Sequence, residues 1–271
     1  MTCENMNLDT SLQELLREVG TFIKTEFERF DYDSVQYKSE NDPFTFVDVE
    51  AERRLRAGCE KLIPECGFIT EELENSHTDR EYVWIIDPID GTSNFTHGMP
   101  HFCIALALQQ HGETIMGYVY QPITEEMFHA EKGKGAFLNG TPIKRSERKE
   151  MKLGLATTGF PYAIEGWVRD YLDMVFEVME ATHGVRRFGS AALDLAAVAS
   201  GRIDIYFETE LKPWDAAAGA LLVQEAGGKV TDLNGGDNYL YGRQLLATNG
   251  YLHDEMLEIT TKSKVMDYIN R

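Results

Sequence analysis

Residues 84–95 read Trp-Ile-Ile-Asp-Pro-Ile-Asp-Gly-Thr-Ser-Asn-Phe. The apolar, β-branched and aromatic run at 82–86 predicts a buried strand. We expect this strand to end at Asp87 and Pro88, because proline cannot donate a hydrogen bond to a sheet ladder. Asp87 and Asp90 then stand three residues apart, followed by small residues suited to a tight turn or a helix start. The stretch therefore predicts a pair of carboxylates at the end of a buried strand.

The two carboxylates and the turn that follows them in the sequence favour ligands of opposite charge. Backbone N–H groups at a helix start favour an anion, which the carboxylates would repel. A hard divalent cation resolves the conflict, because carboxylates hold Mg²⁺ and the bound Mg²⁺ holds a phosphate. For an isolated Asp-x-x-Asp-Gly sequence, a capping and a turn aspartate would be the simpler interpretation. The Mg²⁺ hypothesis therefore depends on further carboxylates in the chain.

The composition restricts the classes of partner. With 271 residues, the chain suits one large domain or two closely packed halves, and 43% hydrophobic and 26% charged residues are ordinary for a soluble globular protein. The net charge of −19 argues against nucleic acid and against an anionic membrane, since both select basic surfaces. A phosphate ester could bind so acidic a protein only if metal ions supplied positive charge.

The cysteines and the N-terminal segment indicate a cytoplasmic protein. The four cysteines have no C-x-x-C spacing, which favours free thiols in a reducing compartment. Glu4 and Asp9 stand where a signal peptide would have a basic region before an apolar core. The apolar stretches are too short to span a bilayer. We therefore expect a soluble protein without membrane contact.

The order of predicted elements indicates layered α/β packing. In the first half, an amphipathic helix at 12–27 and a second helix after Thr45 precede a strand at 67–70, the strand of the opening stretch, and antiparallel strands at 103–108, 115–120 and 127–130. In the second half, helices alternate with strands: helices at 167–180, 190–200, 214–226 and 253–269, and strands at 185–188, 203–207, 229–231 and 245–247. The polar segment 141–152 predicts a soft boundary between halves 1–146 and 147–271, and the polar segment 37–43 predicts a loop.

Further carboxylates stand at the ends of these predicted elements. Glu71 follows the strand at 67–70, and Asp215 begins the small-residue helix at 214–226. Two carboxylates about 4 Å apart repel by roughly 4 kcal/mol at an effective dielectric constant of 20. A cluster of Glu71, Asp87, Asp90 and Asp215 would therefore need protons or cations to neutralise it. Each residue alone is more simply a helix cap, but together they predict a metal site.

Two longer segments closely resemble the signature motifs of the inositol monophosphatases. They are DPIDGTSNFTHGMP at 87–100 and KPWDAAAGALLVQEAGG at 212–228. The likeness extends to Lys38, to TFVDVEAE at 45–52, to FITEE at 68–72 and to FGSAA at 188–192, in the order of the family. The two signatures together are highly specific, and the likeness covers nearly the whole chain.

This resemblance implies a Mg²⁺-dependent, lithium-sensitive phosphomonoesterase that folds as a layered α-β-α-β-α sandwich, is usually a homodimer and binds two or three Mg²⁺ per active site. By position, Glu71, Asp87 and the backbone carbonyl of Ile89 would bind the first metal. Asp87, Asp90 and Asp215 would bind the second metal, and Glu71 with water would bind a looser third.

The resemblance also implies catalytic and substrate-binding roles. Thr92, Asp48 and Glu71 form the catalytic group, in which Thr92, hydrogen-bonded to Asp48, would orient the metal-activated water and help to deprotonate it. The N–H groups of Gly91 and Thr92 would bind the phosphate. Contacts with the ring hydroxyls of myo-inositol monophosphate would come from Ala191, Glu208 and Asp90. Lys38 would contribute to the site from a loop.

The physical chemistry of phosphate esters agrees with these implied roles. A phosphate monoester dianion repels a hydroxide nucleophile, so metal ions must screen its charge and lower the pKa of the attacking water. The protein then positions the parts for direct in-line attack, and no nucleophilic side chain is needed. His97 and His101 are interpreted as structural, because Mg²⁺ prefers oxygen ligands.

Three alternative functions share features with this sequence. A haloacid-dehalogenase-like phosphatase needs a nucleophilic aspartate two residues before Asp90, where this chain has Pro88. A fructose-1,6-bisphosphatase, a bisphosphate nucleotidase or a histidinol-phosphatase stays open, although nucleotidases typically have lysine where Ser93 stands. A non-catalytic binding protein would be expected to lack a ligand, whereas every expected ligand is present.

Small departures from the family pattern concern the substrate more than the reaction. Thr70 stands where the family more often has glycine, and Ser93 stands where threonine is commoner. Glu208 and Glu210 lie close together, so the assignment of the substrate-contacting glutamate between them stays open.

Overall fold

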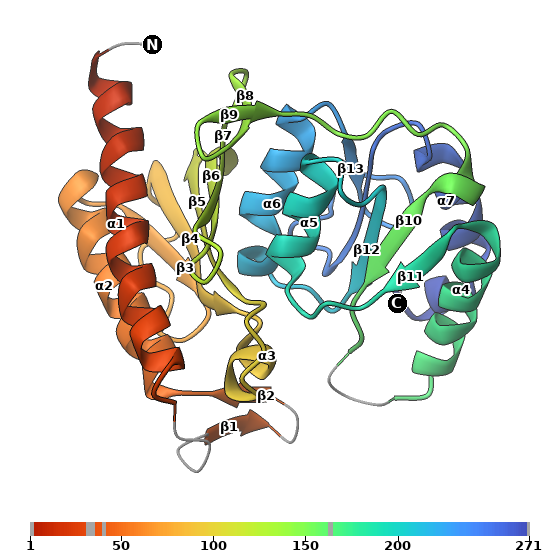
Figure 1. Ribbon diagram of the computed structural model, residues 1–271, viewed down its shortest axis with the longest axis horizontal. Helices are drawn as coiled ribbons and strands as arrows, with labels where there is room; N and C mark the ends of the chain where they lie inside the picture. Colours follow the sequence, from red (N-terminus) through yellow and green to blue (C-terminus); the bar gives the residue numbers. More distant parts are fainter. Residues whose placement is uncertain (1–2, 31–35, 40–41, 162–164, 270–271) are drawn as a thin grey trace.

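The computed structural model describes residues 3–30, 36–39, 42–161 and 165–269. Five layers follow one another across the molecule, helix pair, sheet, helix pair, sheet and helices, which is an α-β-α-β-α sandwich (Figure 1). The fold class expected from the sequence is therefore confirmed. The proposed division into halves at 146/147 stays a prediction.

The first three layers hold the larger sheet between two helix pairs. The outer pair is α1 (Cys3–Phe27) and α2 (Phe46–Leu62), and the inner pair is α5 (Ala191–Ala199) and α6 (Pro213–Glu225). The sheet has the order β3-β4-β5-β6-β7-β8-β9. Its strands are β3 (Gly67–Thr70), β4 (Tyr82–Asp90), β5 (Cys103–Gln110), β6 (Glu113–Gln121), β7 (Glu126–Glu131), β8 (Gly135–Leu138) and β9 (Thr141–Ile143). Only β3 and β4 pair in parallel among these neighbours.

The second sheet lies on the other side of α5 and α6. Its order is β11-β10-β12-β14-β13, with β10 parallel to both β11 and β12. The strands are β10 (Leu155–Thr158), β11 (Gly184–Arg186), β12 (Ile205–Thr209), β13 (Lys229–Thr231) and β14 (Gln244–Thr248). Its outer face is covered by α4 (Val168–Ala181), α7 (His253–Lys262) and α8 (Val265–Ile269). The remaining elements are β1 (Gln36–Ser39), β2 (Asp42–Phe44), α3 (Thr92–Thr96) and the 3₁₀ helix η2 (Met151–Leu153).

Periodic apolar residues attach the outer helices to the larger sheet. Leu12, Leu16, Val19 and Ile23 recur at three- and four-residue intervals on α1 and are almost fully buried. They pack with α2 and with the outer face of the sheet in one hydrophobic cluster. In the described part of the chain, no helix combines the length and apolar character needed to cross a membrane.

Small residues allow α6 to lie close to the larger sheet. Residues 216–223 of α6 are all buried, so this helix is enclosed by protein on every side. A Cβ atom on Gly117 of β6 would lie only 2.8 Å from the carbonyl oxygen of Ala218. Larger side chains at this contact would force the layers apart. The alanine-rich stretch after Asp215 therefore sets the distance at which that carboxylate meets the sheet.

Several local expectations need correction. The strand expected to end at Asp87 and Pro88 continues to Asp90, because the ladder to β5 is irregular between Asp87 and Asp90. The segment 37–43 is not simply a loop, since β1 and β2 pair antiparallel within it. The single helix expected at 253–269 is divided into α7 and α8. Strand β10 was not predicted, because Leu-Ala-Thr-Thr is short and only partly apolar.

Candidate functional site

An irregularity in β4 turns two aspartates toward one cavity. Successive strand residues point to opposite faces, so residues three apart would normally face opposite ways. Here Asp87 pairs with Ala105 and Asp90 pairs with Cys103, so that two residues of β4 oppose one of β5. The bulge compensates for the odd spacing. Both carboxylates therefore face the same side of the sheet.

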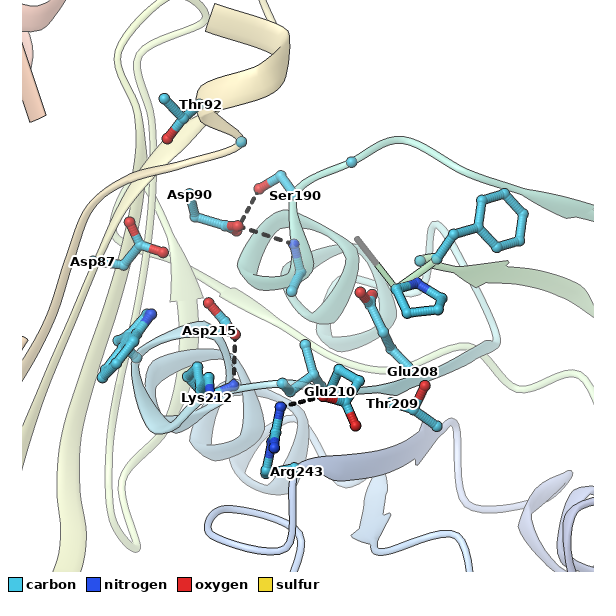
Figure 2. Close-up of a pocket in the computed structure, with 18 of the residues that line it drawn as sticks. Asp87, Asp90, Thr92, Ser190, Glu208, Thr209, Glu210, Lys212, Asp215 and Arg243 are labelled. Carbon is cyan, nitrogen blue, oxygen red and sulfur yellow. Dashed lines mark hydrogen bonds and ion pairs between the residues drawn. The ribbon is translucent and has the colours of Figure 1, made fainter. Parts of the chain in front are cut away.

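A cavity of about 390 Å³ lies where the two sheets meet α5 and α6 (Figure 2). One side carries the carboxylates of Asp87, Asp90 and Asp215, which we call the acidic floor. The opposite side, which we call the far wall, is formed by residues of the second sheet and its loops: Gly159, Phe160, Arg187, Glu208, Glu210 and Arg243. Both sides belong to one cavity.

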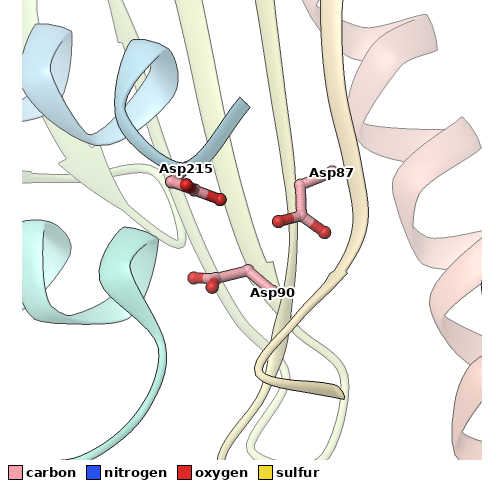
Figure 3. A group of neighbouring side chains, drawn as sticks. All are labelled: Asp87, Asp90 and Asp215. Carbon is pink, nitrogen blue, oxygen red and sulfur yellow. The ribbon is translucent and has the colours of Figure 1, made fainter. Parts of the chain in front are cut away.

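The acidic floor brings together residues from two segments that are far apart in the chain (Figure 3). One carboxylate oxygen from each of Asp87, Asp90 and Asp215 lies within 4.8 Å of the other two. Asp215 reaches this position from the first turn of α6, where its Oδ2 accepts a hydrogen bond of 2.7 Å from the N–H of Lys212. The convergence that the sequence predicted for these three residues is therefore observed.

Burial and mutual repulsion make the charged form of this cluster costly. Burial raises the pKa of Asp87 well above its ordinary value, and the charges of Glu71, Asp90 and Asp215 raise it further. Burial likewise raises the pKa of Asp215, with Asp90 and Glu71 adding to the shift. The pKa of Asp90 rises to about 6 through burial, although hydrogen bonds from Ser190 and Ala192 oppose the shift.

Asp90 is held by the N-terminal turn of α5. The hydroxyl of Ser190 donates to Oδ2 of Asp90 at 2.6 Å, and the N–H of Ala192 donates to the same oxygen at 2.7 Å. The N–H of Ala191 lies 3.3 Å from Oδ1. Ser190 was not predicted as a site residue, although it lies in the FGSAA segment that supplied Ala191. A residue 100 positions along the chain thus fixes the orientation of Asp90.

A second carboxylate, Asp48, supports Thr92 next to the acidic floor. The hydroxyl of Thr92 lies 3.1 Å from Oδ1 of Asp48 and 2.9 Å from the carbonyl oxygen of Ile89. The N–H and the hydroxyl of Thr45 donate to Oδ2 of Asp48 at 2.8 and 2.6 Å. Burial raises the pKa of Asp48 to about 6 despite these bonds. The expected hydrogen bond between Thr92 and Asp48 is present.

Gly91 makes the turn between β4 and α3. Its φ angle of 103° lies in the left-handed region that favours glycine. A Cβ atom there would lie 3.1 Å from the carbonyl oxygens of both Gly189 and His101. Because Thr92 begins α3, its N–H has no partner within the helix. Gly91 and Thr92 both border the cavity.

The turn that carries Glu71 is held by a buried glutamate. Glu52 of α2 is fully buried, and its carboxylate accepts hydrogen bonds from the N–H groups of Glu72 and Leu73 at 2.8 and 3.1 Å. The hydroxyl of Thr70, where the family more often has glycine, donates to the carbonyl oxygen of Leu73 at 3.1 Å. Glu71 itself lines the cavity. Glu52 is a positioning residue that the sequence did not reveal.

Glu208 lies across the cavity from the acidic floor (Figure 2). Burial raises its pKa to about 7, opposed by a hydrogen bond of 2.8 Å from the hydroxyl of Tyr206 and by the charge of Arg187. A Cβ atom on Gly159 would collide with the Glu208 carboxylate at 2.0 Å. Glu210 instead pairs with Arg243 at the same wall. The geometry thus separates the two glutamates that the sequence left open.

Of the other expected residues, some line the cavity and some do not. Ala191 and the backbone of Ile89 line it. Lys38 lies in β1, but its side chain is outside the described residues. His97 is exposed and contacts the carbonyl of Ser93 at 2.7 Å, and neither it nor His101 lines the cavity.

The donor set fits a hard divalent cation. The acidic floor offers carboxylate oxygens, which Mg²⁺ prefers, in a cluster small enough for shared coordination. Neighbouring carboxylates add to the effect of burial in raising the pKa of Asp87. A bound cation would remove that repulsion. The cluster therefore could hold a metal ion.

Known proteins are similar to this chain in sequence and in fold. A sequence profile of the inositol monophosphatase family matches residues 4–264. The protein named Nus factor SuhB of Escherichia coli strain K12 is 40% identical over 242 residues, covering 89% of this chain and 91% of the relative. The inositol-1-monophosphatase of Caulobacter vibrioides is 39% identical over 249 residues, covering 90% of this chain and 97% of the relative. The solved inositol monophosphatase of Thermotoga maritima has a TM-score of 0.86 at 35% identity, covering 97% of this chain and 99% of that structure.

Proposed function

Because the chain belongs to the inositol monophosphatase family, we propose that it is a Mg²⁺-dependent phosphomonoesterase that hydrolyses myo-inositol monophosphate or a similar small polyol or sugar phosphate. The observation that carries the proposal is the acidic floor beside the Thr92–Asp48 pair. The net charge of −19 supports a small-molecule partner over nucleic acid.

Asp87, Asp90 and Asp215 would hold the cation, with Glu71 and the backbone carbonyl of Ile89 completing the ligand set. When bound, Mg²⁺ screens the charge of the phosphate and lowers the pKa of water. The role of the floor residues is to keep their oxygens in place. Asp90 does so through its bonds to the first turn of α5, and Asp215 through its bond to Lys212.

Thr92 and Asp48 would take the proton of the attacking water. With its own hydrogen donated to Oδ1 of Asp48, the Thr92 oxygen can accept a proton through a lone pair. Thr45 holds the carboxylate from the other side. The pKa of Asp48, raised by burial to about 6, is near the range useful for proton transfer at neutral pH.

The phosphate would lie against the turn at Gly91. There the N–H groups of Gly91 and Thr92 can donate to its oxygens, and a side chain at Gly91 would have no room. The leaving group would then extend toward the far wall, where Ala191 and Glu208 border the cavity. Glu208 is oriented by the Tyr206 hydroxyl and can accept hydrogen bonds from ring hydroxyls.

From the family likeness we also propose inhibition by lithium, a homodimer and a cytoplasmic location. The non-catalytic alternative is disfavoured, because Glu71 and Thr92 line the cavity with the complete acidic floor, and Thr92 is hydrogen-bonded to Asp48.

The experiment is phosphate release from myo-inositol 1-phosphate by the purified protein, with Mg²⁺ and with a chelator. Fructose 1,6-bisphosphate and adenosine 3′,5′-bisphosphate serve as comparison substrates. We expect Mg²⁺-dependent turnover of the inositol ester. Faster turnover of another ester would retain the reaction and change the substrate, whereas absence of turnover on all three would contradict the proposal.

A further inference from the structure

Arg187 stands on a short segment whose neighbours are held in place. The side-chain amide of Asn94 donates to the carbonyl oxygens of Phe188 and His101, each at 2.8 Å. Three residues after Arg187, the hydroxyl of Ser190 donates to Asp90. The backbone that carries Arg187 is therefore tied to the turn that follows the acidic floor.

The guanidinium of Arg187 lies over Gly189 and borders the cavity. A Cβ atom on Gly189 would come within 2.2 Å of Nη1 of Arg187, so a glycine is needed for this placement. Gly189 in turn lies against Gly91, where the phosphate is expected. The guanidinium thus borders the cavity on the far wall, separated from the turn at Gly91 by Gly189.

Arg187 differs from the other arginine of the cavity in its pairing. Arg243 is in an ion pair with Glu210. Within the part of the chain that the structure describes, Arg187 has no hydrogen-bond or ion-pair partner. Its five N–H donors are therefore available to a ligand.

Electrostatically, Arg187 belongs to the far wall. Burial raises the pKa values of Glu208 and Asp194, and the positive charge of Arg187 opposes both shifts. The positive charge of Arg187 therefore acts on Glu208, near which the leaving group is expected.

We infer that Arg187 selects substrates whose leaving group carries a second anionic group, a phosphate or a carboxylate, and that it binds this second group. The inference rests on the proposed phosphatase function and specifies its substrate class. A guanidinium matches both anions through two parallel N–H···O bonds. Arg243 already neutralises Glu210, so the acidic groups of this wall do not all oppose a second anion.

The test compares esters that differ only in the second anion. Phosphate release is measured for fructose 1,6-bisphosphate against fructose 1-phosphate, and for 2-phosphoglycerate against glycerol 2-phosphate. In Arg187→Ala, kcat/KM for the doubly anionic member of a pair should fall about 10- to 100-fold, as loss of a charge-assisted contact implies. The singly anionic member should change less than about threefold. Arg187→Lys should restore part of the difference, because lysine keeps the charge but loses the fork.

Arg186→Ala is the matched control. Arg186 is the neighbouring exposed arginine, lies at the end of β11 and does not border the cavity. The Arg186→Ala substitution removes the same charge and should leave kcat/KM unchanged for both members of each pair. Equal losses on both members in Arg187→Ala would overturn the inference, as would no loss on either. A loss confined to the bisphosphate or to the phosphocarboxylate would identify which anion is bound.

A binding measurement separates this inference from the proposed function. Calorimetry with Ca²⁺ in place of Mg²⁺ gives affinities for fructose 1,6-bisphosphate and fructose 1-phosphate without requiring turnover. If the protein hydrolyses neither ester but prefers the bisphosphate through Arg187, the inference stands and the hydrolase proposal fails. If it binds both equally well with or without Arg187, the inference fails whatever the activity.

Discussion

The acidic floor and the far wall of the cavity balance their charges differently. On the floor, three aspartates face one another: the charges of Asp90 and Asp215 raise the pKa of Asp87, and the charge of Asp90 raises the pKa of Asp215. On the wall, Glu210 pairs with Arg243, and the charge of Arg187 opposes the rise in the pKa of Glu208. The floor thus needs protons or a cation from solution to neutralise it, whereas the wall carries its own positive charges on Arg187 and Arg243. We infer that the floor performs the reaction and that the wall selects the substrate.

The largest expected effect is the loss of Mg²⁺-dependent turnover in Asp90→Asn. Metal ions contribute several kcal/mol of transition-state stabilisation, so kcat/KM should fall about 10²- to 10⁴-fold. The fold should persist, because an asparagine oxygen can still accept hydrogen bonds from Ser190 and Ala192. Phosphate release and circular dichroism check the two parts.

Asp254→Asn is the control for this change. Its side chain is 91% exposed and pairs only with Lys229 among the described residues. We expect unchanged turnover. Full activity of Asp90→Asn beside such a control would contradict the proposed cation site.

On the far wall, Glu208→Gln should reduce kcat/KM for myo-inositol 1-phosphate about 10- to 100-fold, mainly through KM. A hydrogen bond to a charged group contributes about 1.5–3 kcal/mol, and the substitution removes that charge. Glu210→Gln is the matched variant and should change kcat/KM less than about threefold, because Glu210 is engaged by Arg243. Steady-state kinetics distinguish the two. The reverse ranking would mean that Glu210 is the substrate contact.

Relief of repulsion should make a floor variant more stable than the parent when no metal is bound. In the chelated protein, Asp215→Asn removes a carboxylate whose pKa is raised by burial and by neighbouring charges. The asparagine oxygen can keep the bond from the N–H of Lys212. The midpoint temperature of thermal unfolding should rise by about 2–4 °C for each kcal/mol of repulsion removed. A lower midpoint would show that the floor is not strained by its charge.

The smallest effect concerns pH and metal together. Asp48 and Asp90 have folded pKa values of about 6, above the usual unfolded value of about 3.9, so the folded state holds extra protons between about pH 4 and 6. The metal-free protein therefore loses stability as pH rises through this window. His253, whose pKa burial lowers to about 4, acts in the opposite sense, but equally with and without metal.

The measurable quantity is the gain in thermal midpoint on adding Mg²⁺. Protons compete with Mg²⁺ for the floor, so this gain should shrink by a few degrees as pH falls from 7 to 5. A gain independent of pH would place the metal elsewhere.

The floor was predictable from the sequence to a greater degree than the wall. Asp87, Asp90 and Asp215 lie in two continuous segments, and their local neighbours place them at a strand end and a helix start. The sequence did not reveal how both β4 aspartates reach one face. Pro88 indicated a strand end, but the bulge leaves it without a ladder partner, so its missing N–H does not interrupt the strand.

The wall could not be predicted in the same way, because it is assembled from separate segments. Arg187 follows β11, whereas Glu208 lies in β12, and the two meet only through tertiary packing. Ser190 illustrates the same limit, since its partner Asp90 lies 100 residues away. No local pattern encodes such contacts. The unpredicted strand β10 adds to this, because it lies inside that sheet, between β11 and β12.

The most direct test of the account is calorimetric titration of the metal-free protein with Mg²⁺ at neutral pH, for the parent and for Asp90→Asn. We expect saturable binding of two or three ions per chain in the parent and loss of at least one of them in the variant. Equal binding by both proteins, or no saturable binding by the parent, would contradict the claim that the acidic floor is the metal site on which hydrolysis depends.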